Sequence, residues 1–126
     1  MATAYTFNVS TGYFDLTNNR PEFVSTTVSE VTSTGITLII TDTNKEHYMY
    51  GKWFVIEKEI NGKWYKVDTI RDDIAFNAIG YSPNKDNKLN LEYNWENIYG
   101  KLPNGSYRIV IMVGTYYSAL EFEIKG

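Results

Sequence analysis

The chain has 126 residues, a formal net charge of −3 and no cysteine. Its length fits one domain that can bury a core without disulfides. The missing thiols exclude disulfides, thiolate zinc sites and cysteine nucleophiles. The interspersed acids and bases predict no nucleic-acid partner, and the lack of an apolar run of about 20 residues predicts no membrane span.

Alternation of apolar and polar residues with a period of two recurs along the chain, and this pattern is typical of half-buried strands. The predicted strands cover residues 22–31, 36–41, 48–60, 64–68, 89–93, 107–113 and 117–125. Residues 70–81 carry a weaker pattern, with Ile74, Phe76 and Ile79 as the expected buried positions. Residues 94–102 have room for one helical turn. Short polar turns between strands of this length favour a sandwich or a small barrel.

One turn is predicted from its residues alone. Asn61-Gly62 stands between two strand-like runs. A type I′ turn needs positive φ at both central residues, which asparagine and glycine accept. The sequence therefore predicts a β-hairpin in which Gly62 is a structural position.

The corner before the predicted strand 107–113 reads Leu102-Pro103-Asn104-Gly105-Ser106-Tyr107. It resembles the corner before strand F of immunoglobulin-like and fibronectin-like domains. There a tyrosine hydroxyl bonds back to the backbone just upstream and pins one end of the sandwich. The resemblance makes Tyr107 and Gly105 structural positions, not ligand contacts.

A longer series of motifs is similar, in its order, to a bacterial immunoglobulin-like domain family of secreted and lipid-anchored proteins from Gram-positive bacteria. The motifs are Tyr50-Gly51, Phe54-Val55-Ile56-Glu57-Lys58, Gly62-Lys63-Trp64-Tyr65, Ala75-Phe76, Trp95, Tyr99-Gly100-Lys101-Leu102, Gly105-Ser106-Tyr107-Arg108 and Glu121-Phe122-Glu123-Ile124. The resemblance implies an all-β fold, an immunoglobulin-like antiparallel β-sandwich of about seven strands, with no catalytic residues. Residues 1–20 are then an N-terminal extension, and residues 21–126 form the sandwich domain.

The resemblance also implies an extracellular or cell-surface location. Residues 1–10 lack the basic start and apolar stretch of a signal peptide. We therefore expect any targeting segment to lie outside the sequence given.

Catalytic chemistry has little support in the sequence. His47 is the single histidine, and it stands beside Glu46 in a predicted loop with no nucleophile motif nearby. Asp72-Asp73 and the Glu57/Glu59 pair are the carboxylates that a glycosidase would need. Acids two residues apart on a strand are more often a solvated face. We therefore expect no enzyme activity.

Two loops are rich in oxygen ligands. Asn84, Asp86 and Asn87 crowd one, and Asp42 with Asn44 crowds the other. Such loops can hold calcium, although neither has the spacing of a calcium loop with its closing glutamate. The alternative is ordinary turns, in which Asx side chains bond their own backbone. We expect no cofactor.

Aromatic residues make up 16% of the chain, and eleven are tyrosine. They cannot all be core. They admit three interpretations: cross-strand pairs that stabilise a sheet, anchors of a protein interface, or platforms that stack sugar rings. The candidates are Tyr48, Tyr50, Trp53, Trp64, Tyr65, Tyr81, Tyr93, Trp95, Tyr99, Tyr116 and Tyr117.

A contact surface follows from alternation along three predicted strands. We expect the core side of these strands to carry Phe54, Ile56, Ile109, Ile111, Leu120 and Phe122. Their neighbours, which point the other way, are Trp53, Val55, Val110, Met112 and Ala119. Because strands C, F and G share one sheet in an immunoglobulin topology, these neighbours predict an apolar contact surface.

The N-terminal extension offers a cover for that surface, because Tyr5, Phe7 and Val9 alternate with polar residues. Our hypothesis is that residues 4–16 pack on this domain, either across the apolar surface or as an added edge strand. The alternative is pairing with a partner or a second copy by strand addition.

The sequence therefore predicts a non-catalytic structural or adhesive module of a bacterial surface or secreted protein. Its expected partner is another protein or a neighbouring domain. The alternative function is a carbohydrate-binding module that uses exposed tyrosine and tryptophan.

Overall fold

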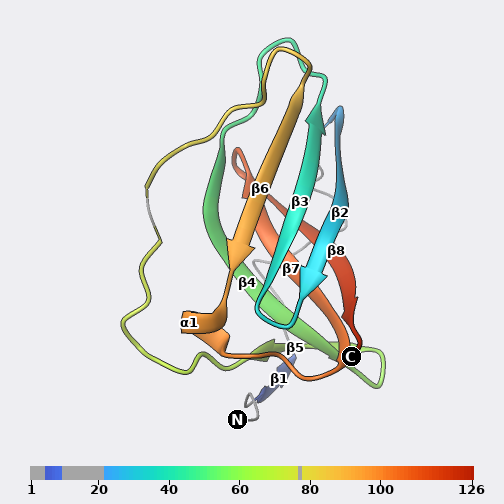
Figure 1. The fold of residues 1–126 in the computed structure, drawn as a ribbon, viewed down its shortest axis with the longest axis vertical. Helices are drawn as coiled ribbons and strands as arrows, with labels where there is room; N and C mark the ends of the chain where they lie inside the picture. The colour runs from blue at the N-terminus through green and yellow to red at the C-terminus, as the bar shows by residue number, and fades with distance from the viewer. Residues whose placement is uncertain (1–4, 10–21, 77) are drawn as a thin grey trace.

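The computed structural model describes residues 5–9, 22–76 and 78–126, and it forms two antiparallel sheets (Figure 1). The elements are β1 (Tyr5–Val9), β2 (Val24–Thr32), β3 (Gly35–Asp42), β4 (Tyr50–Ile60), β5 (Lys63–Val67), β6 (Lys88–Asn94), α1 (Glu96–Tyr99), β7 (Gly105–Val113) and β8 (Tyr116–Ile124). One sheet has the order β1-β5-β4-β7-β8 and the other has the order β2-β3-β6. Figure 1 shows β2, β3 and β6 as one layer over β4, β7 and β8.

The predicted fold class, an all-β immunoglobulin-like sandwich, is confirmed, with β2 to β8 as its seven strands. As expected for strands C, F and G, the strands β4, β7 and β8 are neighbours in one sheet.

β3 shows how alternation builds the core. Its burial changes at every residue, with Ile36, Leu38 and Ile40 buried between half-buried neighbours. The register pairs Leu38 with Val28 on β2 and with Leu91 on β6. The buried core consists of Ile36, Leu38, Ile40, Tyr50, Phe54, Ile56, Val67, Leu91, Tyr93, Trp95, Tyr99, Leu102, Tyr107, Ile109, Ile111, Val113, Phe122 and Ile124.

The connection from β5 to β6 passes from one sheet to the other, and its described residues form no further strand. Phe76 packs on the core, with its ring centre 5.6 Å from that of Phe54. Ile79 is 60% exposed, so the prediction of its burial is wrong. Alternation fails here because a crossover loop has no pleat that sends successive side chains to opposite faces.

The β4–β5 hairpin turns at Asn61-Gly62. The φ angles of these residues are +52° and +81°, and Ile60 pairs with Lys63 across the turn. Both angles are positive, as a two-residue type I′ turn requires.

The corner before β7 contains the hydrogen bond that the resemblance implies. The Tyr107 hydroxyl donates to the carbonyl oxygen of Pro103 at 2.6 Å. Gly105 begins β7, and a Cβ there would clash with Lys58 Nζ. The glycine therefore leaves room for the Lys58 side chain, whose Nζ lies 4.6 Å from the Tyr107 ring centre.

β1 lies at the edge of the five-stranded sheet, antiparallel to β5. Tyr5 is opposite Val67 and Val9 is opposite Tyr65, with a register shift between these pairs. Residues 1–4 and 10–21 lie outside the described residues, and with them most of residues 4–16, for which packing across the apolar surface or as an added edge strand was predicted.

Candidate functional site

The face of the β5-β4-β7-β8 sheet that points away from the second sheet, called the outer face below, is ordered in rows by the strand register. One row joins Val55, Val110 and Ala119 on three neighbouring strands. The next row joins Lys66, Glu57, Arg108 and Glu121 on four strands. The outer face is therefore apolar in one row and charged in the next.

Three of the predicted contact residues, Trp53, Val55 and Met112, are half-buried. Val110 is different because none of its surface is exposed, although it lies outside the cluster between the sheets. Val110 is therefore not exposed in this structure, and its part in a contact surface stays a prediction. Val110 lies in the middle of its row, between Val55 and Ala119, which are half-buried.

Glu57 is the polar centre of the outer face. Its side chain is fully buried, and its Oε1 accepts a hydrogen bond from Arg108 Nε at 2.5 Å. The Arg108 guanidinium lies over the Trp64 ring, 4.6 Å from the ring centre. Glu57 Oε2 is buried and has no hydrogen-bond partner among the described residues. A charge this deep needs its partner, so Arg108 holds the carboxylate in place.

The eleven aromatic candidates divide between buried and half-buried positions. Tyr50, Tyr93, Trp95 and Tyr99 are buried in the core. The other candidates are half-buried, and no tryptophan or tyrosine among the described side chains is exposed. On the outer face, the Trp53 and Tyr117 ring centres lie 5.8 Å apart. The described part of the chain therefore offers no bare platform of aromatic rings.

Asp42 is a second buried carboxylate, at the end of β3. Its Oδ1 accepts hydrogen bonds from the backbone and side-chain nitrogens of Asn44 at 3.0 and 2.8 Å. Its Oδ2 accepts from the Tyr48 backbone nitrogen at 2.8 Å and the Tyr50 hydroxyl at 2.9 Å.

Burial raises the pKa of Asp42, but the hydrogen bonds from Asn44, Tyr48 and Tyr50 outweigh burial and lower that pKa below its usual value. The pKa of Tyr50 is raised, mainly by burial and secondly by the hydrogen bond that its hydroxyl donates to Asp42. Asp42 is therefore an ionised acceptor that organises the loop between β3 and β4.

The Asx-rich loops make turns. Asn84 Oδ1 accepts hydrogen bonds from the backbone nitrogens of Asp86 and Lys88 at 2.9 and 3.0 Å. His47 is half-buried, and its Nε2 lies 2.8 Å from Asn87 Oδ1. The side chains of Asn84, Asn87 and His47 thus form hydrogen bonds within the loops, as those of Asp42 and Asn44 do. In the described ranges, no three histidine or acidic side chains group as metal ligands.

Two of the carboxylates considered for glycoside hydrolysis, Glu57 and Asp73, have separate partners. Glu57 is bound to Arg108, whereas exposed Asp73 forms two hydrogen bonds with Arg71 at 2.7 and 2.9 Å. The Arg71 hydrogen bond lowers the pKa of Asp73 to about 2. A carboxyl group held ionised by a salt bridge is not suited to act as the general acid.

Sequence reasoning missed the Glu57–Arg108–Trp64 cluster. Alternation places Glu57 in phase with Val55, and Arg108 in phase with Val110, so their shared face was predictable. Their pairing depends on the register of two strands, which alternation leaves open by steps of two residues.

The sheet order and the Tyr107 corner are typical of immunoglobulin-like sandwiches, and a family model matches the chain. A model described as bacterial Ig-like domain matches residues 15–123. The chain belongs to the bacterial Ig-like domain family. Domains of this family are generally non-enzymatic modules, and they are common in extracellular proteins. Neither a curated protein nor a solved structure matches the chain.

The helical content of this bacterial Ig-like domain is small. Within the described ranges, α1 (Glu96–Tyr99) is the one α-helix, and no helix is long and apolar enough to cross a membrane.

Proposed function

We propose that this bacterial Ig-like domain is a non-catalytic module of a secreted or cell-surface protein. In this proposal, the outer face of β4, β7 and β8 contacts another protein or a neighbouring domain. The supporting observation is the half-buried apolar set of Trp53, Val55 and Met112 beside the Glu57–Arg108 pair. Apolar side chains around a paired charge are typical of contact surfaces.

The opposite outer face, on β2-β3-β6, has a different character. The side chains of one row are Thr27, Ile39 and Asn90, and those of another are Glu30, Thr37 and Glu92. Apart from Ile39, these side chains carry hydroxyl, amide or acidic groups, which are suited to water. This contrast supports the assignment of contact to the five-stranded sheet.

A photocrosslinking experiment tests the proposal in the whole parent protein. A benzophenone amino acid at Met112 should form an adduct with the contacting domain or protein on intact cells. The matched control places the same group at Thr27, which is exposed on the other sheet. Equal adducts at both positions, or none at Met112, would contradict the proposal.

The carbohydrate alternative has its own outcome. Bacterial polysaccharides are presented to the domain on an array, and the Trp53→Ala variant serves as control. Submillimolar binding that this variant loses would replace the protein-contact proposal with a glycan-binding function.

A further inference from the structure

The chain contains two Asn-Gly pairs, Asn61-Gly62 and Asn104-Gly105. In such a pair, the backbone nitrogen of the glycine can attack the side-chain carbonyl carbon Cγ of the asparagine, because the glycine has no Cβ that shields this nitrogen. The reacting atoms belong to neighbouring residues, so proximity makes the reaction feasible without an enzyme. The local structure then decides which of the two pairs reacts.

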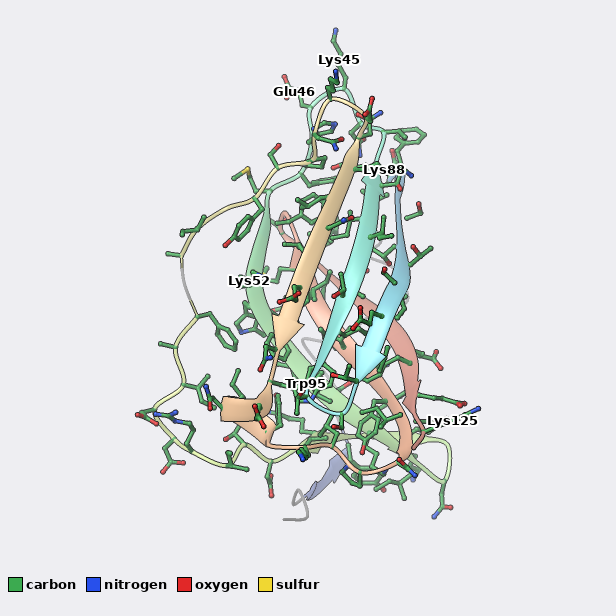
Figure 2. All side chains as sticks on the ribbon, in the orientation of Figure 1. Lys45, Glu46, Lys52, Lys88, Trp95 and Lys125 are labelled. Atoms are coloured by element: carbon green, nitrogen blue, oxygen red, sulfur yellow. The ribbon has the colours of Figure 1, made fainter. Side chains whose placement is uncertain are left out.

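Both pairs lie at the same end of the five-stranded sheet. Lys58 on β4 is opposite Tyr107 on β7. β4 runs from Lys58 to its turn with β5, and β7 begins just before Tyr107, so each Asn-Gly pair lies beyond this register pair on the same side. Figure 2 shows this end of the molecule at Lys125, which follows the β8 residue opposite Gly105. The asparagine of each pair is exposed, so access to water does not distinguish the two sites.

The Asn104-Gly105 pair is held on both sides of its peptide bond. Asn104 Nδ2 donates a hydrogen bond to the carbonyl oxygen of Gly126 at 3.2 Å. The carbonyl oxygen of Asn104 accepts a hydrogen bond from Lys58 Nζ at 3.4 Å. Gly105 is the first residue of β7 and is opposite Ile124 on β8. These contacts restrain both the amide group of Asn104 and the peptide plane that would have to rotate for the attack.

The Asn61-Gly62 pair has none of these restraints. It forms the two-residue turn between β4 and β5, outside both strands. In the part of the chain that the structure describes, the Asn61 side chain has no hydrogen-bond partner, and the Gly62 nitrogen donates no turn hydrogen bond. A Cβ placed on Gly62 would find no atom within 4 Å. The Asn61 amide and the peptide plane that follows it are therefore free to rotate toward each other.

We propose that Asn61 of the folded chain is a site of spontaneous modification to isoaspartate and aspartate, whereas Asn104 is protected. The Gly62 nitrogen bonds to Asn61 Cγ, the Cγ–Nδ2 bond breaks, and the proton from the nitrogen leaves with ammonia. Water then opens the resulting succinimide ring. Attack of water at the backbone carbonyl carbon gives isoaspartate, and attack at Cγ gives aspartate. The reaction consumes one water and releases one ammonia, so it needs solvent alone and is independent of the outer-face proposal.

The isoaspartate product changes the β4–β5 hairpin. The backbone of isoaspartate runs through Cβ and Cγ, so the turn gains one carbon atom. Ile60 is opposite Lys63 across the unmodified turn, and the length of the turn sets this register. Trp64 follows Lys63, and its ring lies 4.6 Å from the Arg108 guanidinium. We therefore expect isoaspartate at position 61 to loosen β5 and its contact with Arg108.

Peptide mapping by mass spectrometry measures both sites in one sample. The folded chain is incubated at mildly alkaline pH, and each Asn-Gly peptide is followed for the mass change from amide to acid. We expect the Asn61 peptide to change about tenfold or more faster than the Asn104 peptide, since only Asn61 can reach the geometry of attack. An isoaspartyl methyltransferase should label the Asn61 product. Equal rates at the two sites, or aspartate without isoaspartate at position 61, would overturn the proposal.

The same measurement in guanidinium chloride is the control for the fold. The unfolded chain loses the contacts of Asn104, so the two sites should then react at similar rates. If Asn61 reacts only in the denaturant, the folded turn protects it and the proposal is wrong. If Asn104 stays slow in the denaturant, its sequence neighbours protect it, and the contacts with Gly126 and Lys58 do not.

Two turn variants test the cyclic route. Asn61→Gly removes the reacting amide and retains a residue that accepts positive φ, so this variant should show no modification at the turn. Gly62→Asn also accepts positive φ but places a Cβ beside the attacking nitrogen, so it should slow the reaction at Asn61. An unchanged rate in Gly62→Asn would mean that water hydrolyses the amide directly, and the cyclic route would be wrong.

The two products provide a matched test of the effect on β5. Both carry the same added negative charge, but only isoaspartate lengthens the backbone. The isoaspartate form, separated by chromatography, should unfold at a lower urea concentration than the Asn61→Asp variant. Equal urea midpoints would overturn the predicted loosening of β5.

Discussion

Asp42 and Glu57 are both fully buried carboxylates, yet the structure satisfies them in opposite ways. Asp42 accepts four hydrogen bonds, two of them from backbone nitrogens, whereas Glu57 is held by the single side chain of Arg108. Asp42 ends β3 beside a loop in which the backbone nitrogens of Asn44 and Tyr48 donate to its carboxylate. Glu57 lies within β4, between β5 and β7, where the ladder uses the backbone groups.

The comparison teaches where a β-sandwich can bury a carboxylate. At a strand end, the neighbouring loop can solvate it with backbone donors. In the middle of a sheet, a cation from the next strand must do so, and loss of that cation leaves the charge alone.

The largest expected effect is at the mid-sheet carboxylate. Arg108→Leu leaves Glu57 buried and unpaired, so the free energy of unfolding should fall by about 3–5 kcal/mol in urea denaturation. Lys88→Leu, on the exposed side of the other sheet, should change stability by no more than about 0.5 kcal/mol. A loss below about 1 kcal/mol in Arg108→Leu would mean that the pair does not stabilise the outer face.

The strand-end carboxylate should be less sensitive. Asp42→Ala should lower the free energy of unfolding by about 2–3 kcal/mol, because the buried Tyr50 hydroxyl loses its acceptor. The loss is smaller than for Arg108→Leu because no charge is left unpaired. Asp42→Asn keeps one oxygen acceptor and should lie between Asp42→Ala and the wild type. An unchanged urea midpoint for Asp42→Ala would show that water can replace the carboxylate as hydrogen-bond acceptor without loss of stability.

The next smaller loss of stability is expected from removing a hydrogen bond between the uncharged Tyr107 hydroxyl and a backbone carbonyl. Tyr107→Phe should cost about 1–2 kcal/mol, because the bond to the Pro103 carbonyl is made by an otherwise buried ring. Thermal unfolding measures the change, and Tyr117→Phe, on a half-buried ring of the outer face, is the comparison. A melting curve equal to that of the wild type would remove the structural role of the Tyr107 hydroxyl.

The smallest expected effect is a dependence on pH. The folded-state pKa of Asp42 is lowered, so its ionised form stabilises the fold above the unfolded-state pKa of about 4. That contribution should be lost as the pH falls through the folded-state value. This contribution to stability is small because burial raises the pKa of Asp42 and so opposes the hydrogen bonds that lower it. Urea denaturation at pH 7 and pH 3 should show a smaller acid loss in Asp42→Asn than in the wild type, and an equal loss would contradict this assignment.

Alternation determined much of the fold without tertiary information. It placed Ile36, Leu38 and Ile40 on one side of a strand, and burial follows the same phase in β3. Asn61-Gly62 determined a turn, because only the two residues and their φ preferences matter there. These features are local, so a few neighbouring residues are enough to specify them.

The tertiary structure alone decided which side chains from distant strands meet. Glu57 and Arg108 are 51 residues apart, and they pair because β4 and β7 adopt one register out of several that keep the same faces. Alternation with a period of two likewise could not predict that Val110 is buried on the outer face or that Ile79 is exposed in the β5–β6 connection. Alternation specifies the face of the strand on which a side chain lies. The strand register and the burial of that face depend on the packing of segments that are remote in the sequence.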